Sequence, residues 1–497
     1  MSFNRTSYFS KTAFLKYDQC PKAFFMYKNY PYLRDPVSKE KQFTFNRGHE
    51  VGKFAQQLFP GGTDVSLAAK NVQDAALLTQ NLIRENITTI YEATFIHNGA
   101  LIMVDILHLS TGKWNAYEVK SSLKISEVYV KDACLQYYVL KNSLPEFEDL
   151  FLVTLNGDYL REETINLHKL FKKRSLKGEG EKNTAFFEHA SAEINLLMEK
   201  NLIPDIQIGR QCFSPYVCDF FGNCWKNSGG EKSVFNIGKV DKEQLFSWFY
   251  GGFDTVEKIG KSDLMKPHLQ IQIDCILNGK EFIDYSAIEI FLKKIPYNSC
   301  YMDMEVWSPA IPKFTGHKPF EQLPFMFSVT SKKEGQSKSH HHIIPEGTND
   351  LRAFIIALIY SVERFEGIIV YDKNLEMQVL SKMESLFPEF SKEIQEIRRK
   401  MIDLSEPVQN FYYYHPKFKG NFSLKAIGEI FSGESNYSNM EVQSGIVAMY
   451  KYESLLLEVN PFAKEEIKQQ LIEYCNQDTV TCLRFHEYLV QKIRERE

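Results

Sequence analysis

The segment LIMVDILHLSTGKWNAYEVKSS, residues 101–122, holds two apolar runs, each of which carries an acidic residue. Both runs are typical of β-strands, with Asp105 in the first and Glu118 in the second. Side chains two residues apart lie on the same face of a strand, so Glu118 and Lys120 are predicted to point the same way. If Asp105 lies on the neighbouring strand, two carboxylates and one ammonium group converge.

This combination of groups is what metal-assisted hydrolysis of a phosphodiester requires. Carboxylates bind Mg²⁺ or Mn²⁺, which prefer oxygen ligands. The bound ion activates water, and a lysine stabilises the developing charge. The alternative is an aspartate at a strand end beside an exposed Glu–Lys pair, with no catalytic role.

A second acidic pattern begins at CYMDMEVW, residues 300–307, which reads as a strand with Asp303 and Glu305 on one face. Far downstream, EYCNQDTVTCLRFHEYL reads as an amphipathic helix. Tyr474 and Asp478 are four residues apart in it, hence on one face of the helix.

Between these elements, GIIVYDKNLE is predicted to be a strand followed by a turn and a helix, with Glu376 at the helix start. Asp372 is a competing candidate in the same stretch. Four carboxylates that converge from two strands and a helix would form a two-metal site for phosphoryl displacement. The alternative for Asp303 and Glu305 is an edge strand with solvated acids.

Four of the nine cysteines have informative positions. Cys212, Cys218 and Cys224 form a C-x5-C-x5-C pattern, and Cys20 lies far upstream. Four thiolates can hold zinc or an iron–sulfur cluster, and buried free thiols are the remaining alternative. The other cysteines lack partners at ligand spacing and are predicted to be core residues: Cys134, Cys275, Cys300, Cys475 and Cys482.

The composition of the chain limits the class of protein to which it can belong. The chain has 497 residues and a formal net charge of −4, and its apolar and charged fractions are those of a globular protein. The longest apolar run falls well short of the roughly 20 residues of a membrane span, and the N-terminus lacks the features of a secretory signal. We therefore expect a cytoplasmic protein with no membrane contact.

The pattern of elements predicts three regions. Residues 1–229 hold strands and helices and end in the cysteine segment, residues 230–297 are predicted to be a helical connector, and residues 298–497 show a new α/β pattern. The polar tract at 331–347, which contains the histidines 340–342, is expected to be a solvated loop and not a metal site.

The residues of the first region resemble the PD-(D/E)XK nucleases of the RecB type. Asp105, Glu118 and Lys120 match the catalytic core of that family. FNRGHEVGKFAQQLFPGG resembles its GHxxG helix, and the resemblance implies His49 as a further metal ligand. Without the resemblance, the alternative for His49 is a structural histidine at a helix start. KDACLQYYVL resembles its Gln/Tyr helix and offers Gln136 and Tyr138, although the usual Q-x3-Y spacing is absent.

The placement of Cys20 upstream and three cysteines downstream resembles RecB-type nucleases with an iron–sulfur cluster, including CRISPR-associated exonucleases. The resemblance implies a [4Fe–4S] cluster on Cys20, Cys212, Cys218 and Cys224 that ties together the two ends of the domain.

The last region resembles DEDD exonucleases on an RNase H-like fold, in the variant with a tyrosine. The resemblance implies metal ligands at Asp303, Glu305, Glu376 and Asp478, with Tyr474 as the residue that orients water. The second motif normally ends in Asp, and here Glu376 takes that place. Nearly the whole chain resembles a group of prokaryotic proteins that fuse these two domains. NFSLKAI is a further match to that group, and its Lys425 either approaches a phosphate or is a lysine at a solvated helix start.

The expectation is therefore an α/β protein with two nuclease-like domains, a [4Fe–4S] cluster and Mg²⁺ or Mn²⁺. We expect it to hydrolyse DNA, with single-stranded ends favoured. The basic stretch at 168–177 either contacts phosphates or forms a solvated loop. The competing hypothesis is a nucleic-acid-binding or assembly protein in which the cluster is structural and one or both sites are inactive.

Overall fold

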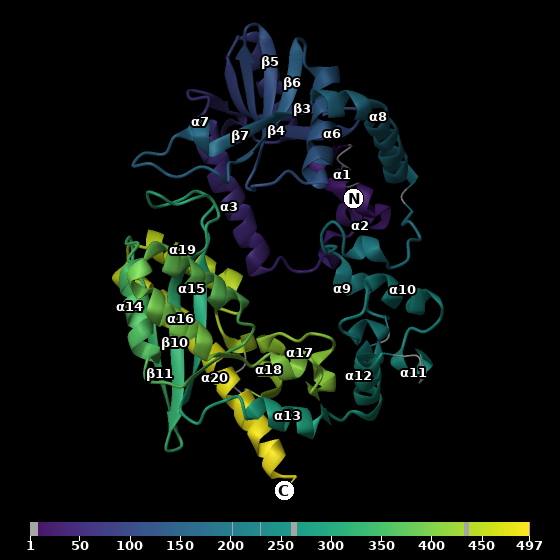
Figure 1. The fold of residues 1–497 in the computed structure, drawn as a ribbon. Coiled ribbons are helices and arrows are strands. Elements are labelled where there is room, and N and C mark those ends of the chain that lie inside the picture. Colours follow the sequence, from purple (N-terminus) through teal and green to yellow (C-terminus); the bar gives the residue numbers. More distant parts are fainter. Residues whose placement is uncertain (1–7, 201, 229, 260–265, 432–436, 497) are drawn as a thin grey trace. The chain divides into compact units, whose positions relative to one another are not determined.

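The structure is a computed structural model, and it describes residues 8–200, 202–228, 230–259, 266–431 and 437–496 (Figure 1). The chain divides into two compact units. Unit 1 comprises Met1–Lys226 with Pro309–Glu321, and unit 2 comprises Asn227–Ser308 with Gln322–Glu497. Both units combine helices with β-sheet, which confirms the predicted α/β class.

Unit 1 is built on a seven-stranded sheet in the order β2-β3-β4-β5-β6-β7, with β1 paired to β4. β3, β4 and β5 are consecutive antiparallel strands, β6 is parallel to β5, and β7 is antiparallel to β6. The strands are β1 (Phe9–Ser10), β2 (Thr63–Asp64), β3 (Thr89–His97), β4 (Ala100–Ser110), β5 (Lys113–Lys120), β6 (Phe147–Leu155) and β7 (Phe171–Ser175).

Two-residue turns set the register of the central strands. Asn98 and Gly99 join β3 to β4, and Thr111 and Gly112 join β4 to β5; all four residues have positive φ. Hairpin turns with positive φ at both positions match the right-handed twist of the strands they connect. These turns fix the register that places Asp105 of β4 beside the end of β5.

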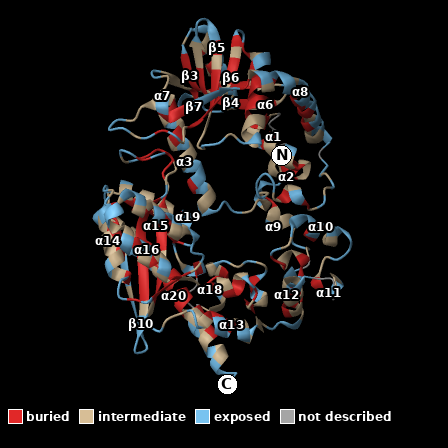
Figure 2. Ribbon diagram, viewed as in Figure 1, coloured by how far each residue is buried: buried red, intermediate tan, exposed pale blue. Residues whose placement is uncertain are grey.

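Helices cover both faces of this sheet. α6 packs on one face, where it shares the larger core with Ala116 and Leu152, and α3 packs on the other, against Tyr117 and Val153 (Figure 2). The helices are α1 (Lys11–Gln19), α2 (Pro21–Asn29), α3 (Lys39–Gln56), α4 (Val65–Ala68), α5 (Val72–Arg84), α6 (Glu127–Ser143), α7 (Leu167–Leu170), α8 (Lys177–Lys200) and α9 (Phe221–Cys224), with 3-10 turns η1 (Pro31–Leu33) and η2 (Arg210–Cys212).

Unit 2 is built on a five-stranded sheet in the order β11-β10-β9-β12-β13. The central strand β9 is antiparallel to β10 and parallel to β12, and β12 is parallel to β13. The strands are β9 (Ser299–Trp307), β10 (Leu323–Lys333), β11 (Gln336–Ile343), β12 (Gly367–Val370) and β13 (Met401–Asp403), with a separate pair β8 (Phe282–Ile283) and β14 (Tyr413–Tyr414).

The long helix α20 packs against β9 and β10, with Tyr474 and Asp478 on its buried side. The helices of unit 2 are α10 (Lys242–Tyr250), α11 (Val256–Ile259), α12 (Pro267–Asn278), α13 (Tyr285–Leu292), α14 (Leu351–Val362), α15 (Asn374–Leu386), α16 (Ser391–Lys400), α17 (Glu406–Gln409), α18 (Leu424–Phe431), α19 (Gly445–Leu457) and α20 (Pro461–Arg494). Its 3-10 turns are η3 (Gly230–Lys232), η4 (Val234–Asn236), η5 (Pro388–Phe390), η6 (Pro416–Phe418) and η7 (Tyr437–Asn439).

The division into units differs from the predicted three regions. The segment predicted as a connector is helical and belongs to unit 2, where Ile237, Val256 and Ile273 form a small core of their own. Residues 309–321, which follow β9 in sequence, belong to unit 1, where Ala310 and Ile311 are buried. Neither assignment is visible in local patterns, because both depend on long-range packing.

One predicted loop is a hairpin. The tract at 331–347 contains the end of β10 and all of β11, joined by Glu334 and Gly335, both with positive φ. β11 lies at the sheet edge and most of it is exposed, so its polar sequence hides its strand character. None of the helices in the described ranges combines the length and the apolar character needed to cross a bilayer.

Candidate functional site

The first candidate site lies where β4 and β5 separate in unit 1. The two strands pair as far as Ile106 and Tyr117. Beyond that pair, Asp105 Oδ2 accepts a hydrogen bond from the backbone N–H of Val119 at 2.6 Å. Glu118, on the same strand as Val119, is next to Asp105. We call the cluster of Asp105, Glu118 and Lys120 the first site.

The carboxylate of Glu118 is buried and asymmetrically bonded. Its Oε1 accepts from Lys120 Nζ at 2.8 Å, as the strand pattern predicts, and also from Lys11 Nζ at 2.7 Å. Its Oε2 is buried without a hydrogen-bond partner among the described residues. An unpartnered buried carboxylate oxygen next to Asp105 fits a metal ligand, because leaving it unpaired is otherwise costly.

Lys120 makes a second ion pair, with Asp132 Oδ2 at 2.5 Å. Asp132 lies on α6, is buried, and has an Oδ1 with no partner among the described residues. Sequence reasoning selected the helix that carries Asp132 but passed over this residue. Lys11 was also missed, because its 107-residue separation from Glu118 gives no local signal.

Glu92 adds a fourth carboxyl group to this region. In the ladder between β3 and β4, Tyr91 pairs with Ile106 and Ala93 pairs with Val104, so Glu92 stands opposite Asp105. Glu92 has φ of 53°, a left-handed conformation that costs a non-glycine residue roughly 1–3 kcal/mol. Such strain is concentrated at functional sites, and no local sequence pattern predicts it here.

The charges of the first site are partly balanced by its own lysines. Burial raises the pKa of Asp105 to about 7, and the charge of Glu118 adds to this rise. Burial would also raise the pKa of Glu118, but Lys11 and Lys120 outweigh it and hold this pKa far below its ordinary value. Burial raises the pKa of Glu92 to about 6. The first site thus has one firmly ionised carboxylate beside two that need a further cation to ionise at low pH.

The other residues implied by the RecB resemblance have different settings. His49 is an exposed residue of α3, and the described structure records no hydrogen bond or ion pair to it. Gln136 is fully buried on α6, one turn after Asp132, and neither polar atom of its side chain has a partner among the described residues. Tyr138 is buried and its hydroxyl accepts a hydrogen bond from Asn98 Nδ2 at 2.9 Å. Gln136 therefore has the burial and the unpartnered polar atoms that are typical of a site residue, whereas His49 is exposed.

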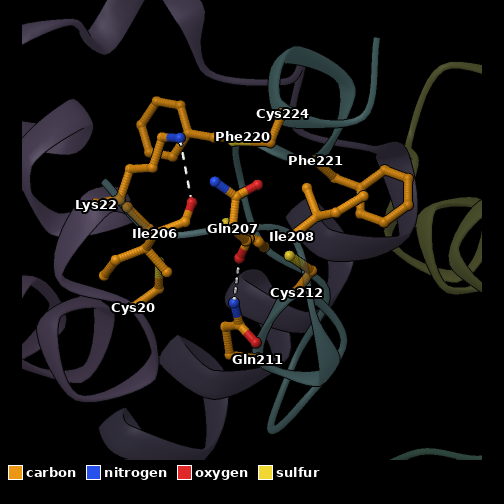
Figure 3. A pocket seen from close by; sticks show the side chains of 12 residues that line it. Cys20, Lys22, Ile206, Gln207, Ile208, Gln211, Cys212, Phe220, Phe221 and Cys224 are labelled. Atoms are coloured by element: carbon orange, nitrogen blue, oxygen red, sulfur yellow. Dashed lines mark hydrogen bonds between the residues drawn. The ribbon is translucent and has the colours of Figure 1, made fainter. Parts of the chain in front are cut away.

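The four predicted cysteine ligands line one cavity of unit 1, of about 360 Å³ including its open part (Figure 3). Cys20 is the residue between α1 and α2, and the three others follow α8. The remaining wall is apolar and includes Ala23, Ile206, Phe220 and Phe221. Those lining cysteines are Cys20, Cys212, Cys218 and Cys224.

Ion pairs hold the cysteine segment against the N-terminal helices. Asp219, between two of the cysteine ligands, pairs with Lys16, with Lys41 at 2.6 Å and with Arg34 at 3.1 Å. Burial would raise the pKa of Asp219, but the lysines outweigh it and lower this pKa to about 2. Gln19 donates to the backbone oxygen of Tyr216 at 2.8 Å.

Thiols are the donors that zinc or an iron–sulfur cluster requires, and in the described residues no three of these sulfur atoms lie within 4.8 Å of one another. Burial raises the pKa of Cys218 to about 11, and the three neighbouring thiols add to the rise. Burial also raises the pKa of Cys224, and a thiol with a raised pKa stays protonated unless a cation stabilises its thiolate. All nine cysteines are free of disulfides, and the five predicted to be core residues are buried.

The second candidate site lies in unit 2, at β9 and α20. Asp303 and Glu305 on β9 and Asp478 on α20 each place a carboxylate oxygen within 4.8 Å of the other two. Glu305 and Asp478 are buried, and Asp303 is half-buried. We call these three residues the second site. The structure thus brings together three residues that the sequence separates by up to 175 positions (478 − 303).

Several side chains surround the second site. The hydroxyl of Tyr437 donates to Asp478 Oδ1, and Tyr474 packs nearby with its ring 6.2 Å from that of Tyr437. Lys425 Nζ lies 5.5 Å from the ring centre of Tyr474, and its charge acts on both Glu305 and Asp478. Tyr437 was not predicted, because the chain between it and α18 shows no motif.

Cys475 is buried as predicted, but it also touches the second site. Its Sγ lies 3.4 Å from Asp303 Oδ2 and donates a weak hydrogen bond to it. The residue precedes Asp478 by less than one helical turn, so its thiol fills the space between α20 and β9.

Glu376 lies at the start of α15, where it is buried with an Oε2 that has no partner among the described residues. Its charge acts on Asp303 and Glu305, although it lies outside the group of three. Asp372 is exposed, and its Oδ1 accepts from Asn374 at 2.5 Å. The structure therefore favours Glu376 over Asp372 as the fourth carboxylate.

The second site brings several acidic groups together in a buried position. Burial, followed by the charge of Asp478, raises the pKa values of Asp303 and Glu305 well above their ordinary range. Burial raises the pKa of Asp478 to about 6, against the hydrogen bond from Tyr437, and raises that of Glu376 to about 8. These carboxyl groups cannot all ionise near neutral pH without a bound cation, so the donor set fits a divalent metal.

Two other features of the sequence give less support to a functional role. The basic stretch at 168–177 includes β7, and several of its cations form exposed ion pairs, as Lys172 does with Asp158 at 2.9 Å. The histidines at 340–342 lie along β11 as consecutive strand residues, so adjacent rings point to opposite faces.

Residues 300–423 match a family model described as "Domain of unknown function (DUF2779)". The matched part carries Asp303, Glu305 and Glu376, whereas Tyr474 and Asp478 lie beyond it. No curated protein and no solved structure matches the chain.

Proposed function

We propose that the protein is a metal-dependent nuclease with two sites, the first in unit 1 and the second in unit 2. The observation that carries the proposal is the convergence of Asp303, Glu305 and Asp478 within 4.8 Å, with Glu376 buried beside them. Buried carboxyl groups without matched cations are destabilising. A cluster of such groups is therefore explained best by the binding of a cation.

The topology of each unit supports the assignment. In unit 2 the strand order β11-β10-β9-β12-β13, with the acids on the central strand, is the arrangement we expect of an RNase H-like fold. In unit 1 three antiparallel strands are followed by α6 and the parallel strand β6, as we expect of a PD-(D/E)XK fold. The proposed reaction follows from the sites and not from these folds alone.

In the second site, Asp303, Glu305, Glu376 and Asp478 would hold Mg²⁺ or Mn²⁺. When bound, such ions supply Lewis-acid activation of water and of the phosphate. Tyr474 lies against Asp478 and would orient the attacking water through its hydroxyl. Lys425 reaches the same group of residues and would attract a phosphate.

In the first site, Asp105 and the free Oε2 of Glu118 would hold the metal, with His49 as a further ligand implied by the RecB resemblance. Lys120 stands beside Glu118 and would stabilise negative charge on the reacting phosphate. Carboxylates beside a lysine suit a phosphodiester as the substrate, and we propose DNA with single-stranded ends.

The cysteine cavity would hold a [4Fe–4S] cluster with a structural role, on Cys20, Cys212, Cys218 and Cys224. Zinc is the alternative for the same four sulfurs. A second candidate function is a nucleic-acid-binding or assembly protein in which one or both sites are inactive. For unit 1 it is favoured by the exposure of His49, to which the described structure records no hydrogen bond or ion pair.

The test uses full-length protein purified without oxygen and labelled single-stranded DNA. We expect Mn²⁺-dependent shortening of the DNA by the parent protein. The triple variant Lys120→Ala/Asp303→Asn/Asp478→Asn should be at least about 100-fold slower, since each change removes a charged group at a reacting centre. Equal degradation by the triple variant would refute the proposal, and binding of intact DNA without cleavage by the parent would favour the binding protein.

A further inference from the structure

Lys11 occupies a fixed position between two parts of unit 1. The strand β1 directly before it pairs with β4, with Phe9 opposite Ala100 and Ser10 opposite Leu101. Ser10 also caps α1, because its side chain accepts a hydrogen bond from Ala13 N at 3.2 Å. Lys11 is the first residue of α1, so both the strand and the cap fix its backbone.

The side chain of Lys11 reaches into the first site. Its Nζ lies 2.7 Å from Glu118 Oε1, the oxygen that also accepts from Lys120 at 2.8 Å. Two ammonium groups on one oxygen fix the plane of the carboxylate. They also leave Oε2 as the buried atom without a partner among the described residues.

The far end of α1 lies at the cysteine cavity. Cys20 follows the last residue of the helix, and Lys16 and Gln19 bind the segment that carries the other three cysteines. Lys11 and Cys20 thus lie at opposite ends of one short helix, which is held by β1 at one end and by the cysteine segment at the other.

We propose that Lys11 is a positioning residue of the first site, which orients Glu118 so that Oε2 is presented to a divalent cation. The inference rests on the proposed function, because it gives Glu118 the part of a metal ligand. Lys11 acts through Glu118 and not on the substrate. Its attachment to α1 would make the orientation of Glu118 depend on the intact cysteine cavity.

The contact of Lys11 with Glu118 has opposite effects on metal binding and on the reaction rate, which makes its role testable. Removing the ammonium group relieves its repulsion of a bound cation, so metal should bind more tightly. It also releases the carboxylate from its fixed orientation, so the reaction should slow, by about 10- to 100-fold as for other groups that orient a metal ligand. A variant that merely damages the fold would weaken both metal binding and rate.

The experiment uses the full-length chain with Asp303→Asn and Asp478→Asn, so that only the first site can bind metal and cleave. Lys11→Met, Lys11→Arg and Lys131→Met are added to this parent. Lys131 is the matched control, because it pairs with Asp18 of α1 at 2.8 Å without contact to Glu118. Cleavage of labelled single-stranded DNA is measured against Mn²⁺ concentration, and Mn²⁺ binding is measured separately by electron paramagnetic resonance.

We expect Lys11→Met to cleave more slowly at saturating Mn²⁺ yet to be half-saturated at a lower Mn²⁺ concentration. Lys11→Arg should recover most of the rate, and Lys131→Met should match the parent, with equal iron content and melting temperature throughout. Unchanged rate and binding in Lys11→Met would overturn the inference, as would a joint loss of rate, Mn²⁺ affinity and iron. A parent that binds Mn²⁺ but cleaves nothing would contradict the proposed nuclease activity alone, and the binding data would still decide the role of Lys11.

Discussion

In unit 1 the carboxylate of Glu118 is held between Lys11 and Lys120, whereas in unit 2 the carboxylates of Asp303, Glu305 and Asp478 face one another within 4.8 Å. The difference appears in the pKa values: that of Glu118 is lowered and those of Asp303 and Glu305 are raised. The first site is therefore organised before any cation binds. The second site stores repulsion that a bound cation relieves.

The largest effect we expect is the loss of cleavage at the first site in Lys120→Ala. The variant removes the ammonium group that bridges Glu118 and Asp132, and the rate should fall by about 100-fold or more. The measurement is Mn²⁺-dependent cleavage by full-length protein whose second site carries Asp303→Asn and Asp478→Asn. Lys113→Ala, at the other end of β5 in an exposed pair with Glu146, is the control. Parent-like cleavage by Lys120→Ala would show that the lysine is not part of the chemistry.

A change at the cysteine cavity should reduce cleavage at the first site without affecting the second site. Cys20→Ser should lose iron and brown colour, lower the melting temperature of unit 1 and reduce cleavage at the first site, because formation of a thiolate site is coupled to folding. Cleavage at the second site, measured with Lys120→Ala present, should persist, since all four cavity cysteines lie in unit 1.

Cys134→Ser is the control for that variant, because Cys134 lies in the main core and away from the cavity. Iron and zinc are measured together. Full iron loading in Cys20→Ser would refute a cluster held by the four cysteines. Stoichiometric zinc without iron would replace the cluster by a structural zinc site.

Neutral variants of the two sites should change stability in opposite directions without metal. Glu118→Gln leaves Lys11 and Lys120 without their carboxylate, and breaking a buried ion pair costs about 3–5 kcal/mol. Asp303→Asn removes one of three repelling carboxyl groups and should raise the melting temperature. The melting temperatures of both variants are measured in a chelator. Shifts of the same sign would show that the two sites do not differ in how their carboxylates are balanced by positive charge.

The smallest effect concerns pH. The pKa of Glu376 is raised from 4.5 to about 8, so the folded chain holds more protons than the unfolded chain between these values. Stability of the metal-free protein should therefore fall as pH rises through this window. Glu376→Gln should lose part of that fall in melting temperature between pH 5 and 8. Equal pH profiles for the parent and Glu376→Gln would mean that Glu376 is not buried as described.

Sequence periodicity predicted the residues of both sites that lie on regular elements. Asp303 and Glu305 share a face because of the two-residue repeat of a strand, and Asp478 joins them because α20 is amphipathic. The grouping of Cys20 with three distant cysteines also followed from spacing and resemblance, and the four line one cavity.

The remaining site residues depend on contacts that no local pattern encodes. Lys11 reaches Glu118 only after β1 pairs with β4, and Glu92 stands opposite Asp105 only through the register of the β3–β4 ladder. β11 was missed because an exposed edge strand does not alternate apolar and polar residues. Residues 309–321 belong to unit 1 through tertiary packing alone.

The central claim is that both acidic clusters are metal sites, and Mn²⁺ binding to the metal-free full-length protein tests it most directly. We predict two classes of site in the binding isotherm. Glu118→Gln should remove one class and Asp303→Asn the other. The class that Asp303→Asn removes should bind more tightly, because the cation there relieves the repulsion that raises the pKa values of Asp303 and Glu305, whereas Glu118 is already paired with Lys11 and Lys120. An isotherm that neither variant changes would contradict the account.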